Sequence, residues 1–237
     1  MAIHLDPSRL KLVAGGERAG KSRLSAEELH CWLWLIDGGV VWIVGPDYEQ
    51  ARAEFDHLTE TAERSGLLAA RSVSRPKQGS CTLKTVLGAT VATKTSADIM
   101  RLASFAPHGV LMVEAGQQSY EVFLKLRGRI AEHRAPMVLS GTFEGALGWY
   151  AELWQRWQTV NPEGGRSFSL PSWTNRAVYP GGRQDPEILA LEATFPADLF
   201  LERFGAVLGT RDPRIVGVHW LGQLGYALLP PVISART

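Results

Sequence analysis

The chain has 237 residues, of which 45% are hydrophobic, and it can therefore build one substantial core. Its formal charge is +1, so the composition indicates neither a nucleic-acid-binding protein nor an acidic partner. The two cysteines, Cys31 and Cys81, lie far apart without metal or redox spacing, which excludes a disulfide scaffold and fits a reducing cytoplasm. We see no signal peptide and no apolar run long enough to span a bilayer, and we expect a soluble intracellular domain.

The first predicted element is a short apolar strand that enters a glycine-rich turn and leaves it as a helix. The spacing Gly15-x-x-x-x-Gly20-Lys21-Ser22 is that of a P-loop. Glycine lets the backbone N–H groups point inward at phosphate oxygens, and the helix N-terminus favours the same anion. We expect Lys21 to reach the β- and γ-phosphates of ATP and the Ser22 hydroxyl to ligate Mg²⁺. The predicted nucleotide-binding residues of the turn are Gly15, Gly16, Glu17, Arg18, Ala19, Gly20, Lys21 and Ser22.

The segments that follow alternate between helices and strands with short connections, which predicts an α/β sheet with right-handed crossovers. The apolar, β-branched run over residues 40–44 lacks alternation, as is typical of a strand covered on both faces. We predict helices over residues 22–36, 47–65 and 119–133, and a short helix capped by residues 96–98. We predict further strands over residues 81–86, 90–93, 110–115 and 136–140.

From about residue 149 the chain changes character. We expect a tryptophan-rich helix, then a strand over residues 167–170 and two short helices over 185–192 and 197–204 that form a cap. The predicted organisation is a P-loop ATPase core over residues 1–148 and a remaining core strand with a lid subdomain over 149–208. A tail over 209–237 could begin a missing nuclease domain.

A single acid ends the strand over residues 110–115. Nucleotide hydrolysis needs Mg²⁺ near the β- and γ-phosphates and a base that positions the attacking water, and P-loop enzymes commonly place an Asp-Glu pair there. Either Glu114 takes the metal-side place and Ala115 leaves the base position empty, or Glu114 is the base and Val113 occupies the metal-side place.

Two polar residues, Ser140 and Thr142, end the following strand. They are well placed to sense the γ-phosphate if that strand lies between the P-loop strand and the acidic strand.

Together these motifs resemble the ATPase domain of the large terminase subunit of tailed bacteriophages, the motor that packages viral DNA. The resemblance is carried by residues 15–22 (Walker A), 41–48 (VWIVGPDY), 110–117 (Walker B), 140–142 (the coupling motif) and 179–205 (the lid region). It implies an ASCE-type P-loop NTPase fold, a mostly parallel sheet flanked by helices with a small C-terminal lid.

The resemblance also implies roles for individual residues. Matched on its Glu-Ala, the Walker B pattern makes Glu114 the catalytic glutamate and puts Val113 where the metal-side aspartate is usual. Arg18 looks like the P-loop arginine that contacts the γ-phosphate in many terminases. A ring motor needs an arginine from the neighbouring subunit, and Arg101 is the first candidate and Arg75 the second. The expected catalytic residues are Glu114, Lys21, Arg18 and Arg101, and the expected metal site comprises Ser22 and Glu114.

The partners implied by the resemblance are double-stranded DNA, the portal protein of an empty procapsid and the small terminase subunit. A homo-oligomeric ring, typically of five subunits, would act in the host cell cytoplasm without a membrane. The helix after Walker B carries a positive face that could touch DNA phosphates or simply be solvated. Its members are Lys125, Arg127, Arg129 and Arg134.

Full-length terminases add a two-metal nuclease domain. The segment 215–220 faintly resembles its first strand, but Asp212 is the sole acid after Gly205, so we expect no nuclease activity from this chain. Two other functions stay open, namely another P-loop translocase of the helicase type and a nucleotide-binding structural module with weak hydrolysis.

Overall fold

The computed structural model describes residues 2–103, 105–143 and 148–208, and only the backbone of residues 2, 101 and 103. Within these residues the chain forms a seven-stranded sheet in the order β3-β4-β2-β5-β6-β1-β7. All neighbouring strands are parallel except β3 and β4, which are antiparallel. The strands are β1 (Leu10–Gly15), β2 (Val40–Gly45), β3 (Thr82–Lys84), β4 (Thr90–Thr95), β5 (Gly109–Val113), β6 (Met137–Gly141) and β7 (Gly165–Leu170).

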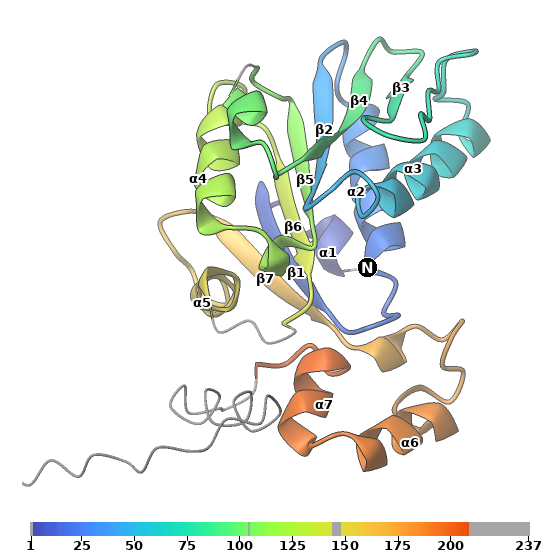
Figure 1. The fold of residues 1–237 in the computed structure, drawn as a ribbon, viewed down its shortest axis with the longest axis vertical. Coiled ribbons are helices and arrows are strands. Elements are labelled where there is room, and N and C mark those ends of the chain that lie inside the picture. The colour runs from blue at the N-terminus through green and yellow to red at the C-terminus, as the bar shows by residue number, and fades with distance from the viewer. Residues whose placement is uncertain (1, 104, 144–147, 209–237) are drawn as a thin grey trace, which may run out of the picture.

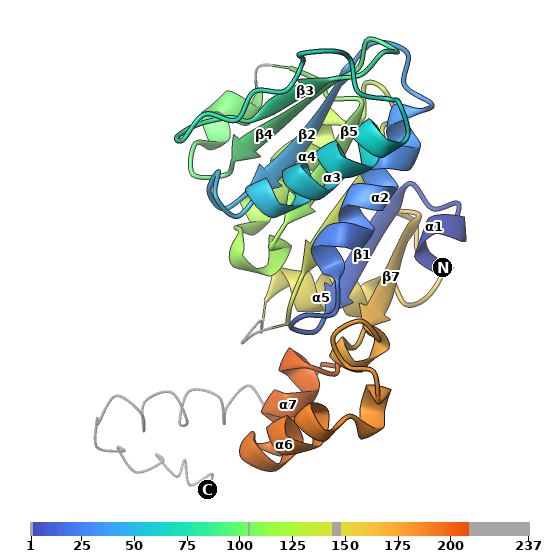
Figure 2. The same cartoon turned by 90° about the vertical axis from the view of Figure 1, so that its right-hand side faces the viewer.

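Helices cover both faces of this sheet (Figures 1 and 2). The α-helices are α1 (Ala2–Leu5), α2 (Lys21–Leu33), α3 (Arg52–Arg64), α4 (Tyr120–Arg129), α5 (Trp149–Arg156), α6 (Pro186–Thr194) and α7 (Ala197–Arg203). Helices α2 and α3 pack on one face around Phe55 and Leu58, in a buried apolar cluster that we call the α2/α3 core. Helices α4 and α5 pack on the other face around Phe123 and Tyr150. Because helices cover both faces of the sheet, its central strands are continuously apolar.

The order of the strands positions the candidate site. Strand β6 lies between β5 and β1, as Ser140 and Thr142 require if they are to sense a phosphate. Ser140 pairs in register with Val13 on one side and with Val113 on the other. The carboxyl ends of the P-loop strand and of the acidic strand therefore flank the end of β6. Ligands of open α/β sheets bind at this edge.

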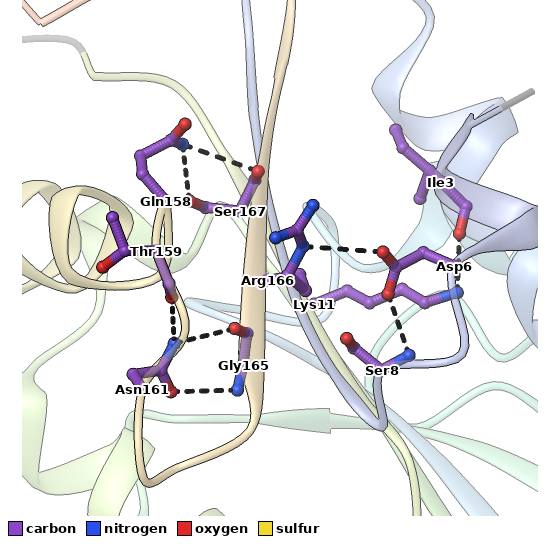
Figure 3. Close-up of polar contacts among 10 residues, drawn as sticks. All are labelled: Ile3, Asp6, Ser8, Lys11, Gln158, Thr159, Asn161, Gly165, Arg166 and Ser167. Atoms are coloured by element: carbon purple, nitrogen blue, oxygen red, sulfur yellow. Dashed lines mark hydrogen bonds and ion pairs between the residues drawn. The ribbon is translucent and has the colours of Figure 1, made fainter.

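A buried lysine ties the N-terminal segment to the sheet. Lys11 of β1 donates from Nζ to the Ile3 carbonyl at 2.7 Å and pairs with the Glu28 carboxylate of α2 at 3.1 Å. Figure 3 shows Lys11 directed toward Ile3, and Asp6 of the same segment facing Arg166 of β7 at 3.6 Å. The segment before β1 is thus held against the P-loop strand and the adjacent edge strand.

The connection between α5 and β7 is closed by a side chain. Asn161 accepts from the Gly165 backbone N–H at 3.2 Å and donates to the Gly165 carbonyl at 2.9 Å (Figure 3). Trp157 leaves no room for a side chain at Gly165, where an added Cβ would lie 2.2 Å from the indole ring. These contacts fix where β7 begins, and β7 then adds to β1 at the sheet edge.

The residues after β7 form a small helical unit below the sheet in Figure 1, beside the ends of β1 and β7. Its apolar cluster comprises Tyr179, Ile188, Phe200 and Phe204. Asp185 caps α6 by accepting from the Glu187 N–H at 3.1 Å, and Pro186 occupies the first turn, as expected for a helix start. The predicted domain boundaries stay a prediction, and the predicted tail over 209–237 lies outside the described residues.

Several predicted helices differ from the structure at their ends or in their type. The helix predicted over 22–36 begins at Lys21 and ends at Leu33. The helix predicted over 47–65 begins at Arg52, because Asp47 accepts from the Gln50 N–H at 2.8 Å and forms a turn first. The helix predicted over 119–133 ends at Arg129. The segment after residues 96–98 is a 3₁₀ turn, η1 (Ile99–Ala103). None of the described helices combines the length and the apolar character needed to cross a membrane.

Candidate nucleotide-binding site

The glycine-rich turn joins β1 to α2 as the sequence predicts. Gly20 adopts a left-handed conformation with φ 92°, and the next residue, Lys21, begins α2. Arg18 also has a positive φ of 58°, so two residues of the turn adopt left-handed backbone conformations. The first N–H groups of a helix have no intrahelical acceptor, so those at the start of α2 point into the turn as anion donors.

Lys21 folds back over this turn. Its Nζ lies 3.2 Å from the Gly16 carbonyl and 3.4 Å from the Gly15 carbonyl. A Cβ on Gly15 would lie 2.4 Å from Lys21 Cγ, so glycine at position 15 provides the space in which the lysine side chain lies. The ammonium group is therefore held at the mouth of the turn.

The other side of the turn is bound to the end of β7 and to the helical unit that follows it, which we call the C-terminal unit. Glu17 donates its N–H to the Arg203 carbonyl at 2.8 Å, and Gly16 donates to the Leu170 carbonyl at 2.9 Å. Ser172 Oγ donates to the Glu17 carbonyl at 2.5 Å, and Asn175 Nδ2 donates to the Arg18 carbonyl at 2.7 Å. The N–H groups of residues 16 and 17 are thus used within the protein. The Ala19 N–H donates to the Gly16 carbonyl at 3.2 Å, so the donors available to an anion include those at the start of α2.

A hollow of about 350 Å³ opens beside the turn. It brings Lys21 and Ser22 together with Glu114, which follows β5 far along the chain. Its lining comprises Arg18, Ala19, Gly20, Lys21, Ser22, Arg23, His57, Glu114, Asn175 and Val178. The two motifs that the sequence singled out therefore face one space.

Glu114 occupies an unusual backbone conformation, with φ 46° and ψ 49°. It directly follows the buried end of β5 and precedes the short turn η2 (Ala115–Gln117). Gln118 Nε2 donates to the Val113 carbonyl at 2.6 Å and to the Val44 carbonyl at 3.1 Å, which joins the ends of β5 and β2. Tyr150 is buried near Glu114. Burial, together with the charge of Glu114, raises the pKa of Tyr150. A left-handed glutamate at a strand end is typical of strain kept at a functional site.

Two side chains of α3, Glu54 and His57, join this site without having been predicted. Glu54 is 3% exposed, and its carboxylate lies near the Ser22 side chain. Burial, together with the charge of Glu114, raises the pKa of Glu54 to about 7 against the lowering effects of Ser22 and Lys21. The available signal was its spacing, since Glu54 follows Ala51 by three residues and precedes Leu58 by four on the buried stripe of α3.

The remaining predicted residues lie at varying distance from this hollow. Ser140 is buried at the end of β6 and Thr142 is half-buried, and neither lines the hollow. Arg75 pairs with Asp56 at 2.8 Å and lies over the Phe55 ring. The side chain of Arg101, in η1, lies outside the described residues.

The basic residues near α4 are partly brought together. Lys125, Arg127 and Arg129 are half-buried and Arg134 is exposed. Burial lowers the pKa of Arg9, and the charges of Arg127 and Arg134 lower it further, so these three guanidinium groups are neighbours. This cluster lies near the start of β1, at the opposite end of that strand from the glycine-rich turn.

The oxygen atoms near Ser22 are of the type that Mg²⁺ prefers. Within the part of the chain that the structure describes, no group of three acidic, histidine or cysteine side chains could hold a metal unaided. P-loop sites hold Mg²⁺ by a hydroxyl, one or two carboxylates, phosphate oxygens and water. The Ser22 hydroxyl with the carboxylates of Glu54 and Glu114 fits that donor set.

Comparison with known proteins gives matches at the level of structure. No protein-family model matches the chain, and no curated protein matches its sequence. The large terminase ATPase domain of Thermus phage P74-26 superposes with a TM-score of 0.69 at 20% identity, covering 86% of this chain and 90% of that one. The large terminase of the thermophilic bacteriophage D6E superposes with a TM-score of 0.67 at 11% identity, covering 86% of this chain and 48% of that one.

The present chain thus spans about half the length of the bacteriophage D6E protein, which has also been solved with ADP and with ATP-gamma-S. The resemblance inferred from the motifs is therefore matched by the architecture: the chain has the fold of the ATPase domain of phage large terminases.

Proposed function

We propose that the chain is the ATP-hydrolysing module of a motor that drives double-stranded viral DNA into procapsids. The observation that carries the proposal is that Lys21, Ser22 and Glu114 line one hollow at the carboxyl edge of the sheet. A cation, a hydroxyl and a carboxylate in that arrangement suit a nucleoside triphosphate. The fold shared with large terminase ATPase domains favours DNA packaging over other P-loop functions.

In this proposal the turn binds the phosphates and Glu114 acts on water. The N–H groups at the start of α2 and the Lys21 ammonium neutralise the β- and γ-phosphates. Bound Mg²⁺ would neutralise charge that develops between these phosphates, and Ser22 would be one of its ligands. Glu114 orients the water that attacks the γ-phosphate, and Arg18, at the rim of the hollow, contacts the same phosphate.

Coupling to DNA movement needs further groups. Ser140 lies between the P-loop strand and the acidic strand, so we assign γ-phosphate sensing to Ser140 and Thr142. Arg101 is proposed to reach the nucleotide of a neighbouring subunit in a ring, because it lies shortly before β5. The portal protein of the procapsid, the small terminase subunit and DNA are the proposed partners.

Steady-state ATP turnover tests the enzymatic part. Lys21→Ala should abolish tight ATP binding, because it removes a fixed cation from the turn, whereas Lys84→Ala on the exposed edge strand should leave binding unchanged. Glu114→Gln should keep ATP binding and lower turnover about 100-fold or more, whereas the exposed Glu121→Gln should not. Normal turnover by both site variants would refute the site assignment.

A second assay separates packaging from helicase action. Stimulation of turnover by procapsids or portal rings with double-stranded DNA is expected of a packaging motor. Stimulation by single strands alone would favour a helicase-type translocase instead.

Val113 favours one further candidate, a nucleotide-binding structural module. It replaces the usual acid with a buried apolar side chain that is 2% exposed. Such a module would bind ATP with an affinity that depends on Lys21 and would turn over too slowly to be affected by Glu114→Gln.

A further inference from the structure

The position next to Glu114 contributes no oxygen ligand. Val113 packs in the α2/α3 core, the cluster that also holds Phe55 of α3. Its side chain therefore faces the same side of the sheet as the helix that starts at Lys21. If the proposed function holds, a metal at Ser22 needs a carboxylate from some other element.

Glu54 of α3 lies where such a carboxylate is needed. It belongs to the buried stripe of α3 and is 3% exposed, although carboxylates are rarely buried without a partner. Its carboxylate lies near the side chain of Ser22, the residue expected to ligate Mg²⁺. Lys21 and Glu114 are close enough for their charges to act on it.

One carboxylate oxygen of Glu54 makes no hydrogen bond within the described part of the chain. Glu54 Oε2 is buried there without a donor. A buried acceptor that lacks a partner is costly, and such atoms call for a specific explanation. A divalent cation beside Ser22 would satisfy this oxygen and would also offset the repulsion between the two neighbouring glutamates.

We propose that Glu54, from α3, supplies the metal-side carboxylate in place of the residue at position 113. The divalent cation would be held by the Ser22 hydroxyl and the Glu54 carboxylate, with phosphate oxygens and water completing its shell. Glu114 then keeps the role of orienting the attacking water. The site is a Walker-type site in which one acid comes from a helix on the sheet face and the other from the strand end.

Binding of Mn²⁺ tests this assignment without relying on turnover. The whole chain, saturated with ADP, is titrated with Mn²⁺ and the unbound ion is measured by electron paramagnetic resonance. Glu54→Gln should weaken Mn²⁺ binding about 10-fold or more, because an amide oxygen is a weaker ligand than a carboxylate. Glu60→Gln, on the exposed side of the same helix, is the matched control and should bind Mn²⁺ as the wild type does.

A second pair of measurements separates metal binding from nucleotide binding. With a chelator present, Glu54→Gln and wild type should bind ADP equally well, since Glu54 is assigned to the metal. The double variant Glu54→Gln with Val113→Asp should recover part of the Mn²⁺ affinity, because it places an acid at the strand position. Mn²⁺ affinity equal to wild type in Glu54→Gln would overturn the inference.

If Glu54→Gln does not fold, Glu54→Asp gives the readout. Its carboxylate is one methylene shorter, so Mn²⁺ affinity should fall by several-fold, and wild-type affinity would overturn the inference. A wild-type protein that binds neither ADP nor ATP would overturn the proposed function itself, and this inference with it. Normal nucleotide binding with Mn²⁺ binding indifferent to Glu54 would overturn the inference alone.

Discussion

Arg203, in the last turn of α7, donates from Nε to the carboxylate of Glu17 in the glycine-rich turn at 2.7 Å. The backbone carbonyl of the same arginine accepts the N–H of the same glutamate at 2.8 Å. The turn proposed to hold phosphate is therefore clamped, by main chain and side chain, to a helix far along the sequence. We expect a rearrangement of the turn on nucleotide binding to move α7 as well.

The first prediction concerns the strength of this clamp. Both side chains are about one-third exposed, so their ion pair should contribute only about 0.5–1 kcal/mol to the free energy of unfolding. A double-mutant cycle of Glu17→Ala and Arg203→Ala in urea measures that coupling. The exposed pair Arg156–Glu163 serves as control and should couple no more strongly. A cycle with zero coupling would mean that the backbone bond alone links the two segments.

The second prediction compares two adjacent glycines of the turn. A Cβ on Gly16 would lie 2.4 Å from Ser172 Oγ and 2.5 Å from the Phe204 carbonyl, so Gly16→Ala should push the C-terminal unit away and expose it to limited proteolysis. A Cβ on Gly15 would meet only the flexible Lys21 side chain and Leu170 at a normal distance, so Gly15→Ala should impair ATP binding rather than proteolytic resistance.

The matched control for both glycines is Gly128→Ala. No atom lies within 4 Å of a Cβ at Gly128 in α4, so this change should stabilise the fold by about 0.5–1 kcal/mol. Equal protease resistance of Gly16→Ala and Gly128→Ala would show that the turn and the C-terminal unit are not packed as described.

The strand framework and the glycine-rich turn could be predicted because local patterns specify them. The apolar, β-branched run at Val40–Gly45 is typical of a strand covered on both faces, and the left-handed backbone conformation just before α2 favours glycine at position 20. The turn and Glu114 were expected to meet because both follow parallel strands, whose carboxyl ends share one edge. Phosphate sensing by Ser140 and Thr142 required β6 to lie between β1 and β5, which the sequence alone did not establish. The structure shows this strand order.

Other features depend on contacts that a pattern of residue types does not reveal. Glu54 occupies a position on the buried stripe of α3. Its proximity to Ser22 depends on how α3 packs against α2, which the sequence pattern does not specify. Ser172 and Asn175 donate to carbonyl groups of the turn that lie more than 150 residues earlier in the chain. The roles of Arg101 and Arg75 stay predictions, because they depend on a neighbouring subunit.

The third prediction concerns the buried ion pair of Lys11 and Glu28. Their side chains are 8% and 4% exposed, so Lys11→Met should cost about 3 kcal/mol or more by leaving a buried carboxylate whose remaining ion-pair partner is His4. Lys11→Met combined with Glu28→Leu should recover most of that loss. Urea denaturation measures both, with Arg156→Ala of the exposed pair Arg156–Glu163 as control, expected within about 1 kcal/mol of wild type.

The fourth prediction follows from the raised pKa of Glu54. Its value of about 7 in the folded protein compares with roughly 4.3 in an unfolded chain, so the folded state binds the proton more tightly. When a chelator removes divalent metal ions, the contribution of Glu54 to the free energy of unfolding is therefore present below pH 4 and is lost as the pH rises to 7. The loss should be on the order of 3 kcal/mol and should level off above pH 7.

The measurement is urea denaturation at several pH values from 4 to 8. Glu54→Gln should remove this slope and be more stable than wild type at pH 8, while Glu60→Gln should follow the wild-type curve. A wild type and a Glu54→Gln protein whose stabilities run parallel from pH 4 to pH 8 would contradict the raised pKa.

The left-handed backbone conformation of Glu114 lowers the stability of the fold, while its side chain is needed for the proposed turnover. Glycine adopts φ 46° without the penalty of about 1 kcal/mol that a residue with a Cβ incurs there. Glu114→Gly should therefore melt at a higher temperature than the wild type and yet be inactive in the proposed reaction. A library of variants selected for heat resistance alone would accumulate glycine or asparagine at this position and would lose the proposed ATPase activity while keeping the fold.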